Sequence, residues 1–373
     1  MLFSLAGCLL FSLVSISVME SFLALAFIFW VFVLVKNKQR IVFPSFFWPL
    51  LVYSGLSLLA VFFSVNTVAS LKDVKKLLLY IFVLIIMTAL ASREGRLMTT
   101  RALLASGLLS TLYSLGYFIF KAQPGQRMRG FMGHYMTQAG VLLLFLCAAL
   151  CFVLFSRDKQ RWLWGIAFLL AVLALTLTLT RSAWIGFVVA LGFILFLYKP
   201  KSLILVPLFI GLFFLLSPDT IKRRALSIFA PRYYSNQLRI QYLKAGIKII
   251  KDFPLLGTGP DTVDMVFQDP RYGLSELAKK NVHLHNNFIQ IAAERGIPTL
   301  LAWVTFIIWA FVSLIPLLKN RDPSVFPYAA AAGAAILALI TAGLFEYNFA
   351  DSEITVLFLY LITVPFASKA VKE

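Results

Sequence analysis

The chain has 373 residues, of which 61% are hydrophobic and only 13% are charged. A soluble domain carries about 25% charged residues, and apolar runs of about 15–23 residues recur here, near the length that spans a bilayer core. An ordinary soluble protein is therefore excluded. The net charge of +18 does not indicate nucleic-acid binding, because the basic residues lie in short clusters between apolar runs, as in membrane proteins.

In chain order we expect twelve transmembrane helices, or eleven if the first two short runs form one hairpin. No Asp, Glu, Lys, Arg or His lies inside any of these runs. Ion-coupled transporters usually keep ionisable residues at mid-membrane depth, so this pattern disfavours a transporter. The expected spans are residues 2–18, 21–35, 41–63, 77–92, 102–120, 137–156, 162–179, 183–198, 202–216, 297–318, 325–345 and 354–367.

Charges in the connections indicate the orientation. One set of alternate connections has fifteen Lys and Arg residues in short segments, whereas the opposite set has seven in short loops and twelve in one long loop. Long loops translocate largely regardless of charge, so the short segments determine the orientation. The set with fifteen Lys and Arg residues is therefore expected in the cytoplasm. We expect both termini to be cytoplasmic and the long loop to face the periplasm or cell exterior.

That long loop, residues 217–296, is the only long polar stretch and contains two of the three histidines. We therefore expect an all-α polytopic membrane protein with nine transmembrane helices in residues 1–216, a large catalytic loop with amphipathic helices at 217–296, and three transmembrane helices in residues 297–373.

Two arginines on this face are candidates for anion binding. Arg181 is the only charge in a very short turn between two apolar runs, although an arginine that merely reaches the membrane interface would look the same. Residues 237–251 have the period of an amphipathic helix, with three lysines on one side and Arg239 among apolar residues. Contact with anionic headgroups explains the lysines, whereas Arg239 needs an anionic partner or a route to water.

The next segment, Pro254 to Pro260, contains Gly257 and Gly259. Glycine permits positive φ and close backbone approach, so we expect a tight turn. A phosphate-facing loop is the alternative, but a bare Gly-x-Gly is weak evidence for it.

The segment around His285 predicts a short helix that begins beside a histidine. Asn286 is suited to cap it, Gly296 to supply the left-handed residue at its end, and Pro298 to stop it. The helix dipole then disfavours the imidazolium form of His285, and a neutral imidazole is what a general base requires. Glu294 would lie about 180° round this helix, so we assign it to structure.

Other chemistries at this histidine have less support. His283 and His285 could form a metal pair on a strand, but no convergent carboxylate or cysteine is identifiable, so we expect no metal. A Ser-His-Asp arrangement stays open, although no nucleophile-elbow pattern is present. Residues 127–134 are a candidate to line the same site, with headgroup binding as the alternative. The acidic residues 346–353 could hold an arginine or a hydroxyl.

These motifs resemble those of a known family. His285-Asn286, nine residues, Gly296, two residues and Thr299 are similar to the signature of bacterial O-antigen ligases, of the O-antigen ligase/polymerase family of membrane glycosyltransferases. Thr180-Arg181-Ser182 and Arg239 followed by Pro254-Leu255-Leu256-Gly257-Thr258-Gly259 resemble it too, and Arg129-Gly130-Phe131 resembles it more loosely. The resemblance covers roughly residues 127–310.

The resemblance implies an inverting, metal-independent glycosyltransferase of the GT-C type in the bacterial inner membrane, with no cofactor. It would transfer a glycan from undecaprenyl diphosphate to a sugar hydroxyl of lipid A–core. By carry-over, His285 is the catalytic histidine, and Arg181 and Arg239 bind the diphosphate. The candidate supporting residues are Asn286, Arg129 and His283.

Three alternatives remain. A polymerase or a protein O-oligosaccharyltransferase would use the same chemistry with another acceptor. A polyprenol-linked glycan transporter would retain transport without His285. A structural lipid-binding protein would leave Arg239 without a role.

Overall fold

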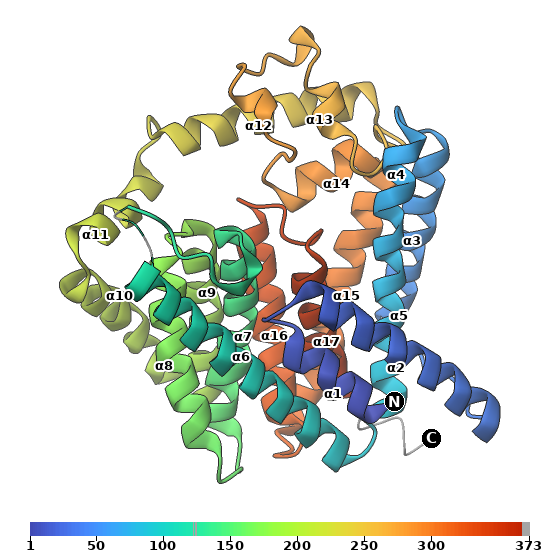
Figure 1. The fold of residues 1–373 in the computed structure, drawn as a ribbon, viewed down its shortest axis with the longest axis vertical. Coiled ribbons are helices and arrows are strands. Elements are labelled where there is room, and N and C mark those ends of the chain that lie inside the picture. Colours follow the sequence, from blue (N-terminus) through green and yellow to red (C-terminus); the bar gives the residue numbers. More distant parts are fainter. Residues whose placement is uncertain (122, 124, 368–373) are drawn as a thin grey trace.

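The computed structural model describes residues 1–121, 123 and 125–367, so the last residues of the third predicted domain, 368–373, lie outside it. The described part of the chain is helical and contains no strand (Figure 1). The α-helices are α1 (Leu2–Phe11), α2 (Ile16–Asn37), α3 (Phe47–Phe62), α4 (Thr67–Val74), α5 (Ile81–Ala89), α6 (Arg93–Lys121), α7 (Tyr135–Phe155), α8 (Arg161–Leu177), α9 (Arg181–Tyr198), α10 (Leu205–Leu216), α11 (Asp219–Leu226), α12 (Tyr234–Asp252), α13 (Val263–Val266), α14 (Asn287–Arg295), α15 (Ile297–Asn320), α16 (Phe326–Gly343) and α17 (Ser352–Ala367). The 3-10 helices are η1 (Lys75–Tyr80), η2 (Gly130–Met132), η3 (Pro200–Ile204), η4 (Ser227–Phe229), η5 (Pro270–Tyr272) and η6 (Ala278–Lys280).

The centre of the helical bundle is formed by α16, which packs against α7, α9, α15 and α17. Alanine fills most of the first half of α16, and small residues let helices in a membrane approach closely. A Cβ added at Gly186 of α9 would meet the carbonyl oxygen of Ala338 at 2.8 Å. Small side chains therefore set the spacing of the central helices.

In the part of the chain that the structure describes, six helices are long and apolar enough to cross a membrane: α2, α6, α7, α9, α15 and α16. Shorter apolar helices are α1, α3, α8, α17 and the η3–α10 segment. Every apolar run predicted from the sequence contains a helix, and the run at 77–92 is divided between η1 and α5. The architecture is consistent with a polytopic membrane protein.

The predicted boundary between the first two runs was wrong. The chain turns at residues 12–15, and the break expected at 19–20 lies inside α2. The turn is made by serines, because the hydroxyl of Ser12 donates to the carbonyl of Leu9 and Ser15 is extended. Glu20, which lies between the two predicted runs, is exposed on α2.

Residues 217–296, which we call the polar segment, contain α11 to α14 and cover one end of the bundle, away from the N-terminus (Figure 1). The segment has a small core of its own, separate from the core of the bundle. That core contains Tyr242, Ile249, Phe267, Tyr272 and Leu284. One face of α12 is therefore buried within the polar segment.

Two close backbone contacts join the C-terminal end of α14 to the turn at residues 254–260. A Cβ at Gly257 (φ +68°) would lie 2.2 Å from the carbonyl carbon of Glu294, and one at Gly296 (φ +84°) would lie 1.9 Å from the backbone of the turn. The amides of Gly257 and Gly259 donate to the carbonyls of Phe253 (3.2 Å) and Glu294 (2.9 Å). Because these amides already have partners, the turn is structural, and the alternative of a phosphate-facing loop is not supported.

Candidate active site

The side chain of Asn286 caps α14 as predicted. Its Oδ1 accepts hydrogen bonds from the amides of Phe288 (2.9 Å) and Ile289 (3.1 Å). His285 directly precedes the cap and has φ +51°, a conformation that non-glycine residues adopt at an energetic cost. The left-handed backbone of His285 thus lies immediately before the capped start of α14.

Both ring nitrogens of His285 have partners of opposite kind. Nδ1 lies 3.0 and 3.1 Å from the two carboxylate oxygens of Glu346, and Nε2 contacts the amide nitrogen Nδ2 of Asn281. An ionised carboxylate can only accept a hydrogen bond and an amide nitrogen can only donate one. These partners therefore fix the neutral tautomer with the proton on Nδ1 and a lone pair on Nε2.

Charges near Glu346 keep it ionised. Burial would raise the pKa of this carboxyl group, but His285, Arg239 and His283 outweigh burial and hold the pKa below its usual value. The carboxylate can therefore stabilise positive charge that appears on the imidazole.

The loop that carries Glu346 is fixed to the start of α14 by amide side chains. Asn287 Nδ2 donates to Asn348 Oδ1 at 2.8 Å, and Asn287 Oδ1 accepts from the Asn348 amide at 3.1 Å. Asn286 Nδ2 donates to the carbonyl of Leu344 at 2.9 Å. The two asparagines after His285 thus position the partner of its ring.

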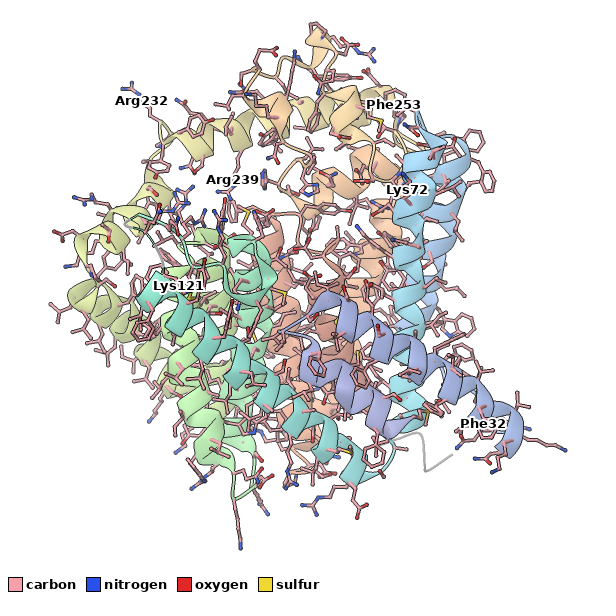
Figure 2. All side chains as sticks on the ribbon, viewed as in Figure 1. Phe32, Lys72, Lys121, Arg232, Arg239 and Phe253 are labelled. Carbon is pink, nitrogen blue, oxygen red and sulfur yellow. The ribbon has the colours of Figure 1, made fainter. Side chains whose placement is uncertain are left out.

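Arg239 lies on the side of α12 that faces the bundle, whereas Arg232 points away from it (Figure 2). Within residues 1–121, 123 and 125–367, Arg239 forms no hydrogen bond and no ion pair. Burial lowers the pKa of Arg239, and Arg224 adds to this effect, while Glu346 opposes it. A half-buried guanidinium without a bonded partner is suited to bind an anion.

Arg181 has a different environment, although it lines the same groove. Its two terminal nitrogens donate to the Ser227 carbonyl (2.6 Å), the Ser227 hydroxyl (2.9 Å), Ser235 (2.7 Å) and Asn236 (2.7 Å). Arg181 therefore anchors the polar segment to the start of α9.

Two further arginines reach the turn between α8 and α9. Arg127 donates to the carbonyls of Thr178 (2.8 Å) and Leu179 (2.9 Å), and Arg224 donates to the same Leu179 carbonyl at 3.1 Å. Burial, together with Arg224 and Arg239, lowers the pKa of Arg127 to about 10, although the ring of Tyr135 opposes the shift. Because Arg224 and Arg239 both lower the pKa of Arg127, the three guanidinium groups lie close enough to repel one another.

A groove of about 300 Å³ is lined by Arg181, Asn236, Arg239 and Phe345, the neighbour of Glu346. It shares residues 185, 228 and 229 with a second, apolar groove of about 280 Å³ between α8, α9 and α10. Because the lining is shared, a cationic surface continues directly into an apolar one.

The other predicted site residues lie nearby. Arg129 is exposed, and His283 is half-buried against the edge of the Tyr347 ring. Burial lowers the pKa of His283, and His285 adds to this effect, while Glu346 opposes it. Among the described residues, no group of three or more His, Cys, Asp and Glu side chains could hold a metal ion.

A second charged cluster lies at the other end of α14. Arg295 donates to Glu294 (2.9 Å), Tyr347 (3.1 Å) and Asp73 (2.7 Å), and Gln290 donates to the other oxygen of Glu294. Arg295 and Glu294 are almost fully buried. These contacts confirm that Glu294 is structural.

Sequence reasoning did not identify Glu346 or Asn281 as partners of His285. Glu346 belongs to a loop that was singled out for its acidity, but its partner there was expected to be an arginine or a hydroxyl. Asn281 lies four residues before His285 in irregular chain, where no periodic pattern relates the two side chains.

Comparison with known proteins adds independent evidence. A family model described as O-antigen ligase matches residues 166–304, which include Arg181, Arg239 and His285. A search of curated proteins found no match. The resemblance seen in the motifs is thus confirmed over residues 166–304, the region that matches the O-antigen ligase family model.

Proposed function

We propose that the protein transfers a glycan from undecaprenyl diphosphate to a sugar hydroxyl of lipid A–core during lipopolysaccharide assembly. The observation that carries the proposal is the contact of His285 with Glu346, a carboxyl group whose pKa Arg239 helps to lower, while Arg239 itself is half-buried and has no bonded partner among the described residues. A base and an anion site side by side are what such a transfer requires.

In the proposed reaction the acceptor hydroxyl attacks the anomeric carbon. His285 Nε2 takes the hydroxyl proton, which contributes roughly 10²–10⁴-fold in rate, and Glu346 stabilises the imidazolium. The new glycosidic bond forms as the bond to the diphosphate breaks, and the diphosphate leaves with the bonding electrons. Attack opposite the leaving group inverts the anomeric centre.

Positive charge on the groove stabilises the departing diphosphate. Arg239 is free to form two parallel hydrogen bonds to phosphate oxygens, which a lysine could not form. Arg181 contributes charge to the groove wall and holds the Ser227–Asn236 region around it. Charge placed in advance needs no reorganisation when the bond breaks.

The apolar groove supports a lipid-linked donor. Its wall is formed by side chains of α8, α9 and α10 together with residues 225, 228 and 229, and it adjoins the arginines. A polyprenyl chain there would place its diphosphate in the cationic groove and raise the effective concentration of the donor at the base.

We also propose a location and an architecture for the protein. The chain would be a GT-C-type enzyme with about twelve spans in the bacterial inner membrane, with cytoplasmic termini. The polar segment and the active site would face the periplasm. Arg129, His283 and Asn286 would support the site.

The test uses purified full-length protein in detergent with EDTA. Undecaprenyl-diphosphate glycan is supplied with or without lipid A–core. We expect product only when lipid A–core is present. Longer glycan on the lipid carrier without added acceptor would indicate a polymerase, and product only with an added acceptor protein would indicate a protein O-oligosaccharyltransferase. No covalent product under any condition would contradict a glycosyltransferase.

A further inference from the structure

The side chain of Asn281 is held with its amide nitrogen, and not its amide oxygen, toward His285. Its Oδ1 accepts from the Val282 amide at 3.0 Å, and its Nδ2 donates to the hydroxyl of Tyr242 at 3.3 Å and to Nε2 of His285. Tyr242 in turn donates to the carbonyl of Ala278 at 3.1 Å and is buried in the core of the polar segment. All three polar contacts agree on the orientation of this amide.

The nitrogen that Asn281 occupies is the one that must accept a proton. Nδ1 is bonded to Glu346, so Nε2 has the only available lone pair on the ring. A lone pair that accepts a hydrogen bond from an amide cannot at the same time take a proton from a well-aligned hydroxyl. In this structure the base is therefore correctly oriented but blocked.

We propose that Asn281 is a latch that keeps water from using His285 until the acceptor sugar displaces the amide, a role that rests on the proposed function. A water molecule is small and always present, so an exposed base beside a lipid-diphosphate glycan would promote hydrolysis of the donor. A sugar hydroxyl that arrives with the binding energy of a whole acceptor can replace the amide, whereas a single water gains too little by doing so.

The reaction that the latch prevents is balanced. Water oxygen attacks the anomeric carbon, one water proton passes to His285 Nε2, and the carbon–oxygen bond to the diphosphate breaks. The products are free glycan and undecaprenyl diphosphate, and no other reactant is required.

Two substitutions of Asn281 should act in opposite directions. Asn281→Ala removes the amide and exposes Nε2, so donor hydrolysis without acceptor should rise about 2–10-fold, the factor that corresponds to one hydrogen bond. Asn281→Asp is nearly isosteric but presents an acceptor to Nε2. It should hold a proton there and lower both hydrolysis and transfer by about 100-fold or more, as for loss of the base.

A merely structural role for Asn281 would give the reverse order, since aspartate preserves shape better than alanine. Tyr242→Phe removes the hydroxyl that steadies Asn281 and should raise hydrolysis by less than Asn281→Ala does. Lys280→Ala is the matched control, because Lys280 is the exposed neighbour in η6 and should leave both rates unchanged.

The experiment measures free glycan and lipid A–core-linked glycan for the full-length variants in detergent, each with and without lipid A–core. Asn281→Ala/His285→Gln should lose the extra hydrolysis, which ties it to the base. Transfer lost in Asn281→Ala without increased hydrolysis would overturn the latch, while wild-type transfer and its loss in His285→Gln would leave the proposed function intact. Unchanged activity in His285→Gln alone would overturn the base itself.

Discussion

Clusters of the same kinds of charged side chain lie near the two ends of α14, but their members are paired to different extents. At its C-terminal end, Arg295 is buried and bonded to Glu294, Tyr347 and Asp73. Near its N-terminal end, Arg239 faces the pair of His285 and Glu346 without a bonded partner in the described chain. Residue type alone does not distinguish these clusters, whereas the number of bonds already made does.

The difference is energetic. A buried charge is tolerated when it is paired and hydrogen-bonded, and such a cluster holds segments together. Arg295 joins α14 to α4 in this way, across more than two hundred residues of sequence. Incomplete pairing costs stability, and the Arg239 side of the polar segment, where pairing is incomplete, is the side on which we propose that the reaction takes place.

The largest effect should come from His285→Gln. Glutamine keeps a polar side chain of similar size but cannot accept and hold a proton, so transfer should fall by roughly 10²–10⁴-fold. The unfolding midpoint in detergent should stay within a few degrees of wild type. Transfer at the wild-type rate would contradict the assignment of His285 as the general base.

Arg295→Ala should break the other cluster. It leaves Glu294 and Asp73 buried without their partner, and removal of one member of a buried pair costs about 3–5 kcal/mol. We expect a large drop in the thermal midpoint and in the yield of folded protein. Arg271→Ala is the control, because Arg271 is exposed and pairs with Asp252 and Asp269. Equal midpoints for the two variants would contradict a structural role of Arg295.

Arg239→Ala should leave folding intact and reduce turnover. Loss of one preorganised donor costs about 10²–10³-fold in rate. Arg239→Lys should recover only part of this because lysine lacks the planar fork. Arg232→Ala, on the outward side of the polar segment (Figure 2), should be neutral. If Arg239 and Arg232 variants transfer glycan equally well, the anion site lies elsewhere.

Glu346→Gln should have the smallest effect of the four. A hydrogen bond to a charged group contributes about 1.5–3 kcal/mol, which is about 10–150-fold in rate. Because the pKa of Glu346 is lowered in the folded protein, its contribution to stability is present above its ordinary pKa and is lost as pH falls through the lowered value. Unfolding midpoints of wild type and variant, compared from neutral to acid pH, should therefore converge at low pH. A difference that widens in acid would contradict this linkage.

Much of the architecture could be predicted because hydropathy and helix signals are local. Every predicted apolar run contains a helix, and the cap at Asn286 follows from residues adjacent in sequence. The turn at residues 12–15 could not be predicted, because serines can satisfy a turn without lowering the hydropathy of the run.

The site was predictable only where a motif or a lone charge drew attention to a residue. Arg181, Arg239 and His285 stand out in this way. Pairing of His285 with Glu346 and with Asn281 depends on how the polar segment folds over the loop between α16 and α17, which no sequence period reports. Whether an arginine is paired, as Arg295 is, or unpaired, as Arg239 is in the described chain, likewise depends on contacts with α4 and with that loop.

The position of Glu346 has a consequence for biogenesis. Arg127, Arg181, Arg239 and His285 all precede it in the chain, and Glu346 lies in the loop before the last helix. Chains emerge from the ribosome N-terminus first, and their earlier parts fold first. A nascent chain can therefore contain the arginines of the groove while His285 still lacks the carboxylate that contacts its ring. The contact between His285 and Glu346 forms only when α17 brings its preceding loop into place, so a chain truncated before that loop would lack the partner of the proposed base.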